Sequence, residues 1–86
     1  MTRAQVKQAV LDALMAVVPE ARPAEIDPVA PLREQLDIDS MDFMNFVVTL
    51  DQALGVDVPE SEYGRLATLD GCVDYLAGRL GVPAPP

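Results

Sequence analysis

The residues best suited to chemistry lie in one short stretch, where Ser40 is flanked by Asp37, Asp39 and Asp42. Apolar residues at helical spacing begin directly after it, so Ser40 is expected at a helix N-terminus. Unpaired backbone N–H groups and the helix dipole favour an anion there, and a phosphate ester on Ser40 would therefore be tolerated. The chain has no histidine, so no Ser-His pair can activate the hydroxyl from within. Ser40 is accordingly predicted to be modified by another enzyme and not to act as a nucleophile itself.

The chain is strongly acidic. Its 86 residues carry a formal net charge of −8, and the segment from Glu34 to Glu62 contains eight acids and neither lysine nor arginine. Nucleic acids and anionic membranes both attract basic proteins, so neither is an expected partner. Basic protein surfaces are expected instead, although the acidity also fits a role in solubility alone.

Cys72 is the only cysteine, which excludes an internal disulfide and fits a reducing cytosol. It lies on the predicted apolar face of the last helix, so a buried, unreactive thiol is expected. The first residues lead into an amphipathic pattern and not into a secretion signal, and no stretch is apolar enough to span a bilayer. A cytoplasmic location is therefore predicted.

Four helices are predicted to position Ser40. The apolar spacing indicates helices over about residues 2–18, 40–54 and 69–80, and a short, weak helix over 60–66. Residues 19–39 form a long connection that is broken by four prolines. Its apolar residues are expected to pin it to the core: Ile26, Val29, Leu32, Leu36 and Ile38. The predicted fold is all-α, a small bundle of three main helices plus one short helix over residues 1–81, with a flexible tail over residues 82–86.

The second helix has clear end signals and two apolar stripes. Asp39 is the expected N-cap, Asp42 completes a capping box, and Gly55 ends the helix. One stripe is expected to face the core and consists of Phe43, Phe46, Val47, Leu50 and Leu54. The other consists of Met41, Met44 and Val48 on the side of Ser40. It is either buried core or an exposed, adaptable contact surface, and the pattern leaves both open.

With these residues placed, the chain resembles the acyl carrier proteins from Val6 to about Gly81. The stretch Leu36-Asp37-Ile38-Asp39-Ser40-Met41-Asp42 resembles the family signature Leu-Gly-x-Asp-Ser-Leu-Asp at the start of the second helix. The long connection before it, the Val58-Pro59-Glu60 entry to the short helix and the Thr68-Leu69 start of the last helix are also similar to the family.

The resemblance implies that Ser40 receives 4′-phosphopantetheine from coenzyme A through a holo-carrier synthase, with Asp39 beside it as a transferase recognition residue. The arm would hold acyl groups as thioesters for partner enzymes of fatty-acid or specialised acyl and polyketide metabolism. The chain would then be a monomeric carrier and not an enzyme, and it would bind no metal of its own. By the same resemblance, the residues that contact the basic patches of partners would be Asp37, Met41, Asp42, Met44, Val48 and Asp51. An acyl chain would lie near Phe46, Leu66, Leu69 and Val73, although plain core is the simpler interpretation of these four.

The chain departs from the family pattern at several positions. Asp37 replaces the glycine before Asp-Ser, which adds a charge and stiffens the loop. Asn45 and Gln52 stand where the second helix often has glutamate. Phe43 and Phe46 are bulkier than usual, which leads to the hypothesis that they narrow the acyl cavity for a specialised pathway.

Other functions fit parts of the pattern. A peptidyl or aminoacyl carrier would use the same serine, and an unmodified acidic helical adaptor would dock a basic partner through Met41, Met44 and Val48. Asp37 and Asp39 begin like a calcium-binding EF-hand loop. That pattern fails at Met41, and again where the loop requires a glycine and a final glutamate.

Overall fold

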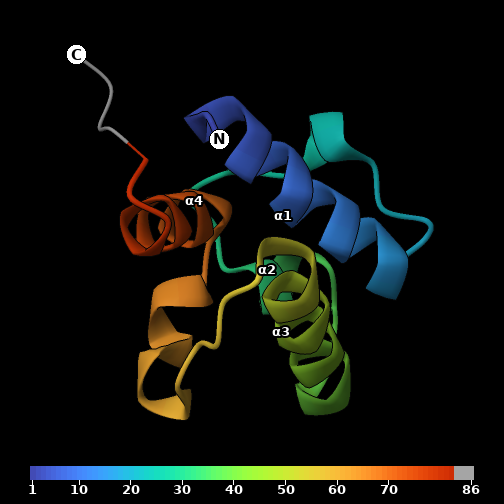
Figure 1. Ribbon diagram of the computed structural model, residues 1–86. Helices are drawn as coiled ribbons and strands as arrows, with labels where there is room; N and C mark the ends of the chain where they lie inside the picture. The colour runs from blue at the N-terminus through green and yellow to red at the C-terminus, as the bar shows by residue number, and fades with distance from the viewer. Residues whose placement is uncertain (83–86) are drawn as a thin grey trace.

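The computed structural model describes residues 1–82 and is all-helical, with no strand in that range. The α-helices are α1 (Arg3–Val17), α2 (Leu32–Gln35), α3 (Ser40–Leu54) and α4 (Leu69–Arg79), and two 3-10 segments are η1 (Pro23–Glu25) and η2 (Glu60–Leu66). Figure 1 shows α1 lying across α3 and α4, with η2 next to α4. The predicted all-α bundle with a long first connection is confirmed.

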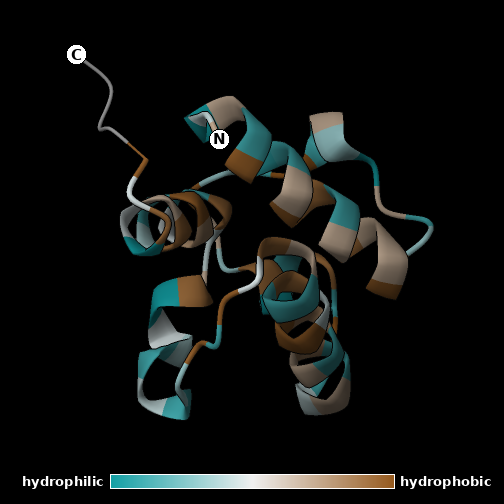
Figure 2. Cartoon of the chain, viewed as in Figure 1, coloured by the Kyte–Doolittle hydropathy of each residue, from teal (hydrophilic) through white to brown (hydrophobic). Residues whose placement is uncertain are grey.

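The core lies where α1, α3 and α4 face one another. Figure 2 shows the hydrophobic segments of these helices turned towards this centre. The side chains that are completely inaccessible include Val10, Leu14, Phe46, Leu50 and Leu76. Burying each such side chain stabilises the fold by about 1.5–3 kcal/mol, so the three helices hold each other in place mainly through aliphatic contacts.

The helix ends follow local sequence signals. The Thr2 hydroxyl accepts a hydrogen bond from the Gln5 N–H at 3.2 Å, and the Gln5 side chain accepts one from the Thr2 N–H at 2.8 Å. The Thr68 hydroxyl accepts from the Gly71 N–H at 2.9 Å and so caps α4. Gly55 ends α3 in the left-handed conformation, with φ 66°. These contacts satisfy backbone groups that have no partner inside the helix.

The long connection is held down by α2. Leu32 is completely buried, and its N–H donates to the Ala67 carbonyl at 2.8 Å. The Gln35 side chain accepts from the Asp27 N–H at 2.9 Å and donates to the Ala30 carbonyl at 3.0 Å. These bonds connect α2 both to Ala67, at the link between η2 and α4, and to the preceding loop, so α2 is fixed against these two segments.

The prediction that Val29 packs on the core is wrong. Ile26, Leu32 and Ile38 are buried and Leu36 packs on the core, but Val29 is 70% exposed. The Val29 N–H donates to the Asp27 carboxylate at 3.0 Å, which closes a local turn around Pro28. The turn places Val29 at its outer side, where the core cannot reach it.

The predicted C-terminal tail is only partly described. Val82 packs against the core, and its N–H donates to the Ala77 carbonyl at 2.9 Å, so this residue belongs to the folded body. The rest of the predicted tail, residues 83–86, lies outside the described residues.

Candidate functional site

Ser40 is the first residue of α3 and is exposed to solvent. The Asp39 carboxylate accepts from the Asp42 N–H at 2.8 Å, and the Asp42 carboxylate accepts from the Asp39 N–H at 3.4 Å. This reciprocal pair is the predicted capping box. Two of the three acids around Ser40 therefore fix the start of α3, and the serine hydroxyl takes no part in these capping bonds.

The loop before Ser40 is a tight, hydrogen-bonded turn. The Leu36 N–H donates to the Leu32 carbonyl at 3.0 Å, and the Ile38 N–H donates to the Arg33 carbonyl at 3.1 Å. Between them Asp37 has φ 51°, the left-handed region in which glycine is favoured. The turn joins α2 to α3 and brings side chains of the two helices together.

Replacing Asp37 with glycine should raise the free energy of unfolding by about 0.5–1 kcal/mol. The relief of left-handed strain should outweigh the greater entropy that glycine gives the unfolded chain. Urea unfolding followed by circular dichroism measures the change. Gly55→Ala is the matched control with the opposite expected effect. Gly55 has φ 66°, and an added Cβ would meet nothing within 4 Å, so only the left-handed backbone conformation opposes alanine there. The free energy of unfolding should therefore fall by about 1 kcal/mol. A less stable Asp37→Gly protein would mean that the aspartate side chain contributes more than its conformation costs.

Arg33 is a residue beside Ser40 that sequence analysis did not single out. It lies seven positions before Ser40, just outside the acidic segment, yet its guanidinium donates to Ser40 Oγ at 3.2 Å. The same guanidinium carbon is 5.9 Å from the centre of the Phe43 ring, within the range of a cation–π contact. The surroundings of Ser40 are therefore not uniformly acidic.

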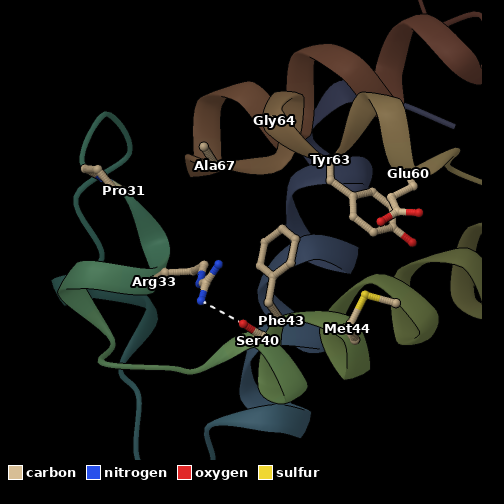
Figure 3. Close-up of a pocket in the computed structure, with 9 residues that line it drawn as sticks. All are labelled: Pro31, Arg33, Ser40, Phe43, Met44, Glu60, Tyr63, Gly64 and Ala67. Atoms are coloured by element: carbon tan, nitrogen blue, oxygen red, sulfur yellow. Dashed lines mark hydrogen bonds between the residues drawn. The ribbon is translucent and has the colours of Figure 1, made fainter.

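An open cavity of about 420 Å³ lies beside Ser40. Figure 3 shows Arg33 and Ser40 on one side, Phe43 in the middle, and Glu60 and Tyr63 from η2 on the other side. The remaining lining residues are Pro31, Met44, Gly64 and Ala67. Most of the lining is apolar, and Arg33 and Glu60 are its only charged side chains. The cavity can therefore accept a flexible, mainly neutral chain that begins at the serine.

The residues predicted for acyl-chain binding do not line this cavity. Phe46 and Leu66 are completely buried, and Leu69 and Val73 are at most 4% exposed. All four belong to the closed core, where they pack against other buried side chains. Of the two phenylalanines predicted to narrow the acyl site, only Phe43 borders the cavity. A role in holding an acyl chain stays a prediction for Phe46, Leu66, Leu69 and Val73.

The second stripe of α3 is exposed. Met41, Met44 and Val48 are 71%, 42% and 47% exposed, so the core interpretation is wrong and their predicted exposure is confirmed, while their contact with a partner stays a prediction. Asp51, predicted as a partner contact, is half-buried, and its carboxylate accepts from the Val58 N–H at 3.4 Å. Burial is the main cause that raises the pKa of this carboxyl group. Asp51 thus supports the turn between α3 and η2, while its contact with a partner stays a prediction.

The Cys72 thiol is buried on α4 and donates to the Leu66 carbonyl at 3.4 Å. Burial raises its pKa to about 12, because an apolar interior disfavours the thiolate.

At pH 8 the folded chain should therefore react slowly with a thiol reagent, whereas the urea-unfolded chain should react completely. The Cys72 thiol ionises near pH 9.0 in the unfolded chain, but its pKa is about 12 in the folded chain. Between these values the unfolded state loses its proton first, so the free energy of unfolding should fall only as the pH rises from 9.0 towards 12. Fast reaction of the folded chain at pH 8 would contradict this assignment.

Residues 1–82 contain neither a helix suited to crossing a membrane nor a cluster of metal ligands. None of the helices in this range has the length and apolar character that crossing a membrane requires. No three histidine, cysteine or acidic side chains in the same range are grouped so that they could hold a metal ion.

Comparisons with known proteins agree on one family. Residues 5–76 match the family model described as "Phosphopantetheine attachment site". The acyl carrier protein of Myxococcus xanthus is 33% identical over 75 residues, which cover 84% of this chain and 95% of that protein. The acyl carrier protein of Micrococcus luteus is also 33% identical over 75 residues, covering 84% of this chain and 93% of that protein. That of Rubrobacter xylanophilus is 34% identical over 53 residues, which cover 62% of this chain and 65% of that protein.

A solved structure supports the same fold. The structure of the acyl carrier protein from Enterococcus faecalis superposes with a TM-score of 0.72 and 21% sequence identity. The superposition covers 91% of this chain and 98% of that one. At this level of identity the match establishes the helical fold alone.

Proposed function

Because this chain belongs to the acyl carrier proteins, a family defined by a phosphopantetheine attachment site, we propose that Ser40 is the residue that carries the prosthetic group. The supporting observation is the exposed Ser40 hydroxyl at the first residue of α3, at the edge of an open cavity. A transferase can reach this hydroxyl without unfolding the chain. Ser61, the only other serine, lies in η2 outside the cavity lining.

The residues around Ser40 fit a phosphate ester that continues into a flexible chain. The Arg33 guanidinium contacts the serine oxygen, and the first turn of α3 adds the positive end of the helix dipole. Phe43, Met44 and Tyr63 offer apolar walls to the neutral part of the arm. When attached, the prosthetic group supplies the thiol to which acyl groups are linked as thioesters. The chain itself is a carrier and not an enzyme, so its own task is to hold and present the arm.

The exposed stripe of α3 is proposed to contact the enzymes that load and process the acyl group. Met41, Met44 and Val48 form an apolar strip on the Ser40 side of α3, and Asp37 and Asp42 add negative charge beside it. A partner with a basic patch would meet both features, and the contact should weaken as salt is added. Action within fatty-acid or specialised acyl metabolism, a monomeric state and a cytoplasmic location remain parts of this proposal.

The proposal is tested by incubating the purified chain with coenzyme A, magnesium and a broad-range phosphopantetheinyl transferase. The intact mass should rise by one phosphopantetheine group. The modified, folded protein should also show one fast-reacting thiol at pH 8, because Cys72 is buried and its pKa is raised to about 12. The unmodified, folded protein is the control and should show none. No gain in mass with any competent transferase would refute the proposal.

A further inference from the structure

We propose that Arg33 binds the phosphate of the prosthetic group and so fixes the direction in which the arm leaves Ser40. This inference rests on the proposed function of Ser40. It concerns a residue of this chain that reaches the attachment point from a different helix, and it assigns to Arg33 a role in positioning and not in the transfer of the group.

The backbone of Arg33 is held in place from both sides. Its neighbour Leu32 is completely buried and bonded to the Ala67 carbonyl at 2.8 Å. Its own carbonyl accepts from the Ile38 N–H at 3.1 Å, two residues before Ser40. The arginine side chain therefore starts from a fixed point, and α2 and the turn after it aim it at the start of α3.

The Arg33 guanidinium already contacts the atom that would carry the group. It donates to Ser40 Oγ at 3.2 Å, as the dashed line in Figure 3 shows, and it lies against the face of Phe43. A guanidinium has five N–H donors in a planar fork that suits phosphate oxygens. A group next to the ester oxygen is also next to the phosphorus attached to it, so Arg33 can reach the non-ester oxygens through a small change of rotamer.

The positive charge of the Arg33 guanidinium is not paired with a carboxylate among residues 1–82. Among residues 1–82, Arg3 is paired with Asp74 and Arg65 with Glu62, but Arg33 forms no ion pair within 4 Å. A charge-assisted hydrogen bond to phosphate would be stronger than its present bond to a neutral hydroxyl. The new contact would therefore not require Arg33 to give up a carboxylate.

The charges around the cavity favour one position for the phosphate. Asp39 and Asp42 lie on either side of Ser40 in the sequence, so another negative charge there is repelled unless a cation offsets it. Glu60 lies across the cavity from Arg33 (Figure 3) and would repel a phosphate from that wall. The phosphate is thus expected on the Arg33 side, with the neutral arm directed over Phe43.

The experiment compares the chain before and after modification by nuclear magnetic resonance. Intact mass first establishes that Ser40 is modified. In ¹⁵N-arginine-labelled protein, the Arg33 Nε–H signal should then shift and exchange more slowly with solvent, whereas the Arg65 signal should stay in place. The ³¹P signal of the modified protein should move in Arg33→Gln, move less in Arg33→Lys, and stay unchanged in Arg65→Gln. Arg65 is the matched control because it is exposed and does not line the cavity.

The outcomes separate this inference from the proposed function. If the wild-type chain gains no mass, both fall together. If it gains the mass but the Arg33 signal and the ³¹P signal of Arg33→Gln do not change, only the role of Arg33 is overturned. The labelled wild-type chain gives its result without any substitution, so a poorly folded variant does not weaken the test.

Discussion

Protein with alanine in place of Ser40 should gain no mass from coenzyme A and a transferase, whereas Ser61→Ala should gain as much as the wild type. The chain has only these two serines. Both are exposed, but only Ser40 begins a long helix and borders the cavity. The expected difference is complete loss against no loss, because the hydroxyl oxygen is itself the atom that forms the ester. Intact-protein mass spectrometry measures it directly.

The folded state of Ser40→Ala should be nearly unchanged. Ser40 is exposed, and its side chain is not part of the Asp39–Asp42 capping box, so stability should change by less than about 0.5 kcal/mol. Circular dichroism and urea unfolding provide this control. A mass gain in Ser40→Ala with wild-type stability would move the attachment site to another residue.

Replacing Phe46 with alanine should destabilise the fold by about 3–5 kcal/mol. Phe46 is completely buried in the core, and its ring centre lies 6.0 Å from that of Phe43 at an angle of 55°. The substitution leaves a cavity that the surrounding helices can fill only in part. Because a small domain is stable by only about 5–15 kcal/mol, a substantial fraction of the variant should be unfolded at moderate temperature. The midpoint of urea unfolding measures the effect.

Two other substitutions calibrate this result. Phe46→Leu keeps most of the apolar volume and should destabilise the fold much less than Phe46→Ala. Met41→Ala removes a side chain that is 71% exposed and should change stability by less than about 0.5 kcal/mol. Equal losses in Phe46→Ala and Met41→Ala would show that the core is not where the structure places it.

The parts of the fold set by neighbouring residues could be predicted from the sequence. The starts of α1, α3 and α4 depend on Thr2, Asp39 and Thr68, whose side chains bond to backbone groups three residues later. Ser40 could be placed at a helix start for the same reason. The end of α3 at Gly55 also follows from the conformation of one residue.

The features that depend on tertiary contacts could not be predicted in this way. Periodicity shows that Met41, Met44 and Val48 share a face, but only the positions of the other helices decide that this face stays exposed. Arg33 approaches Ser40 because Leu32 is anchored to Ala67, a contact between residues far apart in the chain. The left-handed conformation of Asp37 was missed as well, although the family signature has glycine at this position, because an aspartate does not signal it by itself.

Attachment at Ser40 is tested most directly by locating the added group in the modified wild-type chain through fragmentation in a mass spectrometer. Every fragment that carries the group should contain Ser40, and fragments that contain Ser61 without Ser40 should have their unmodified mass. A group found on Ser61 or on any other residue, or a chain that no competent transferase modifies, would contradict attachment at Ser40.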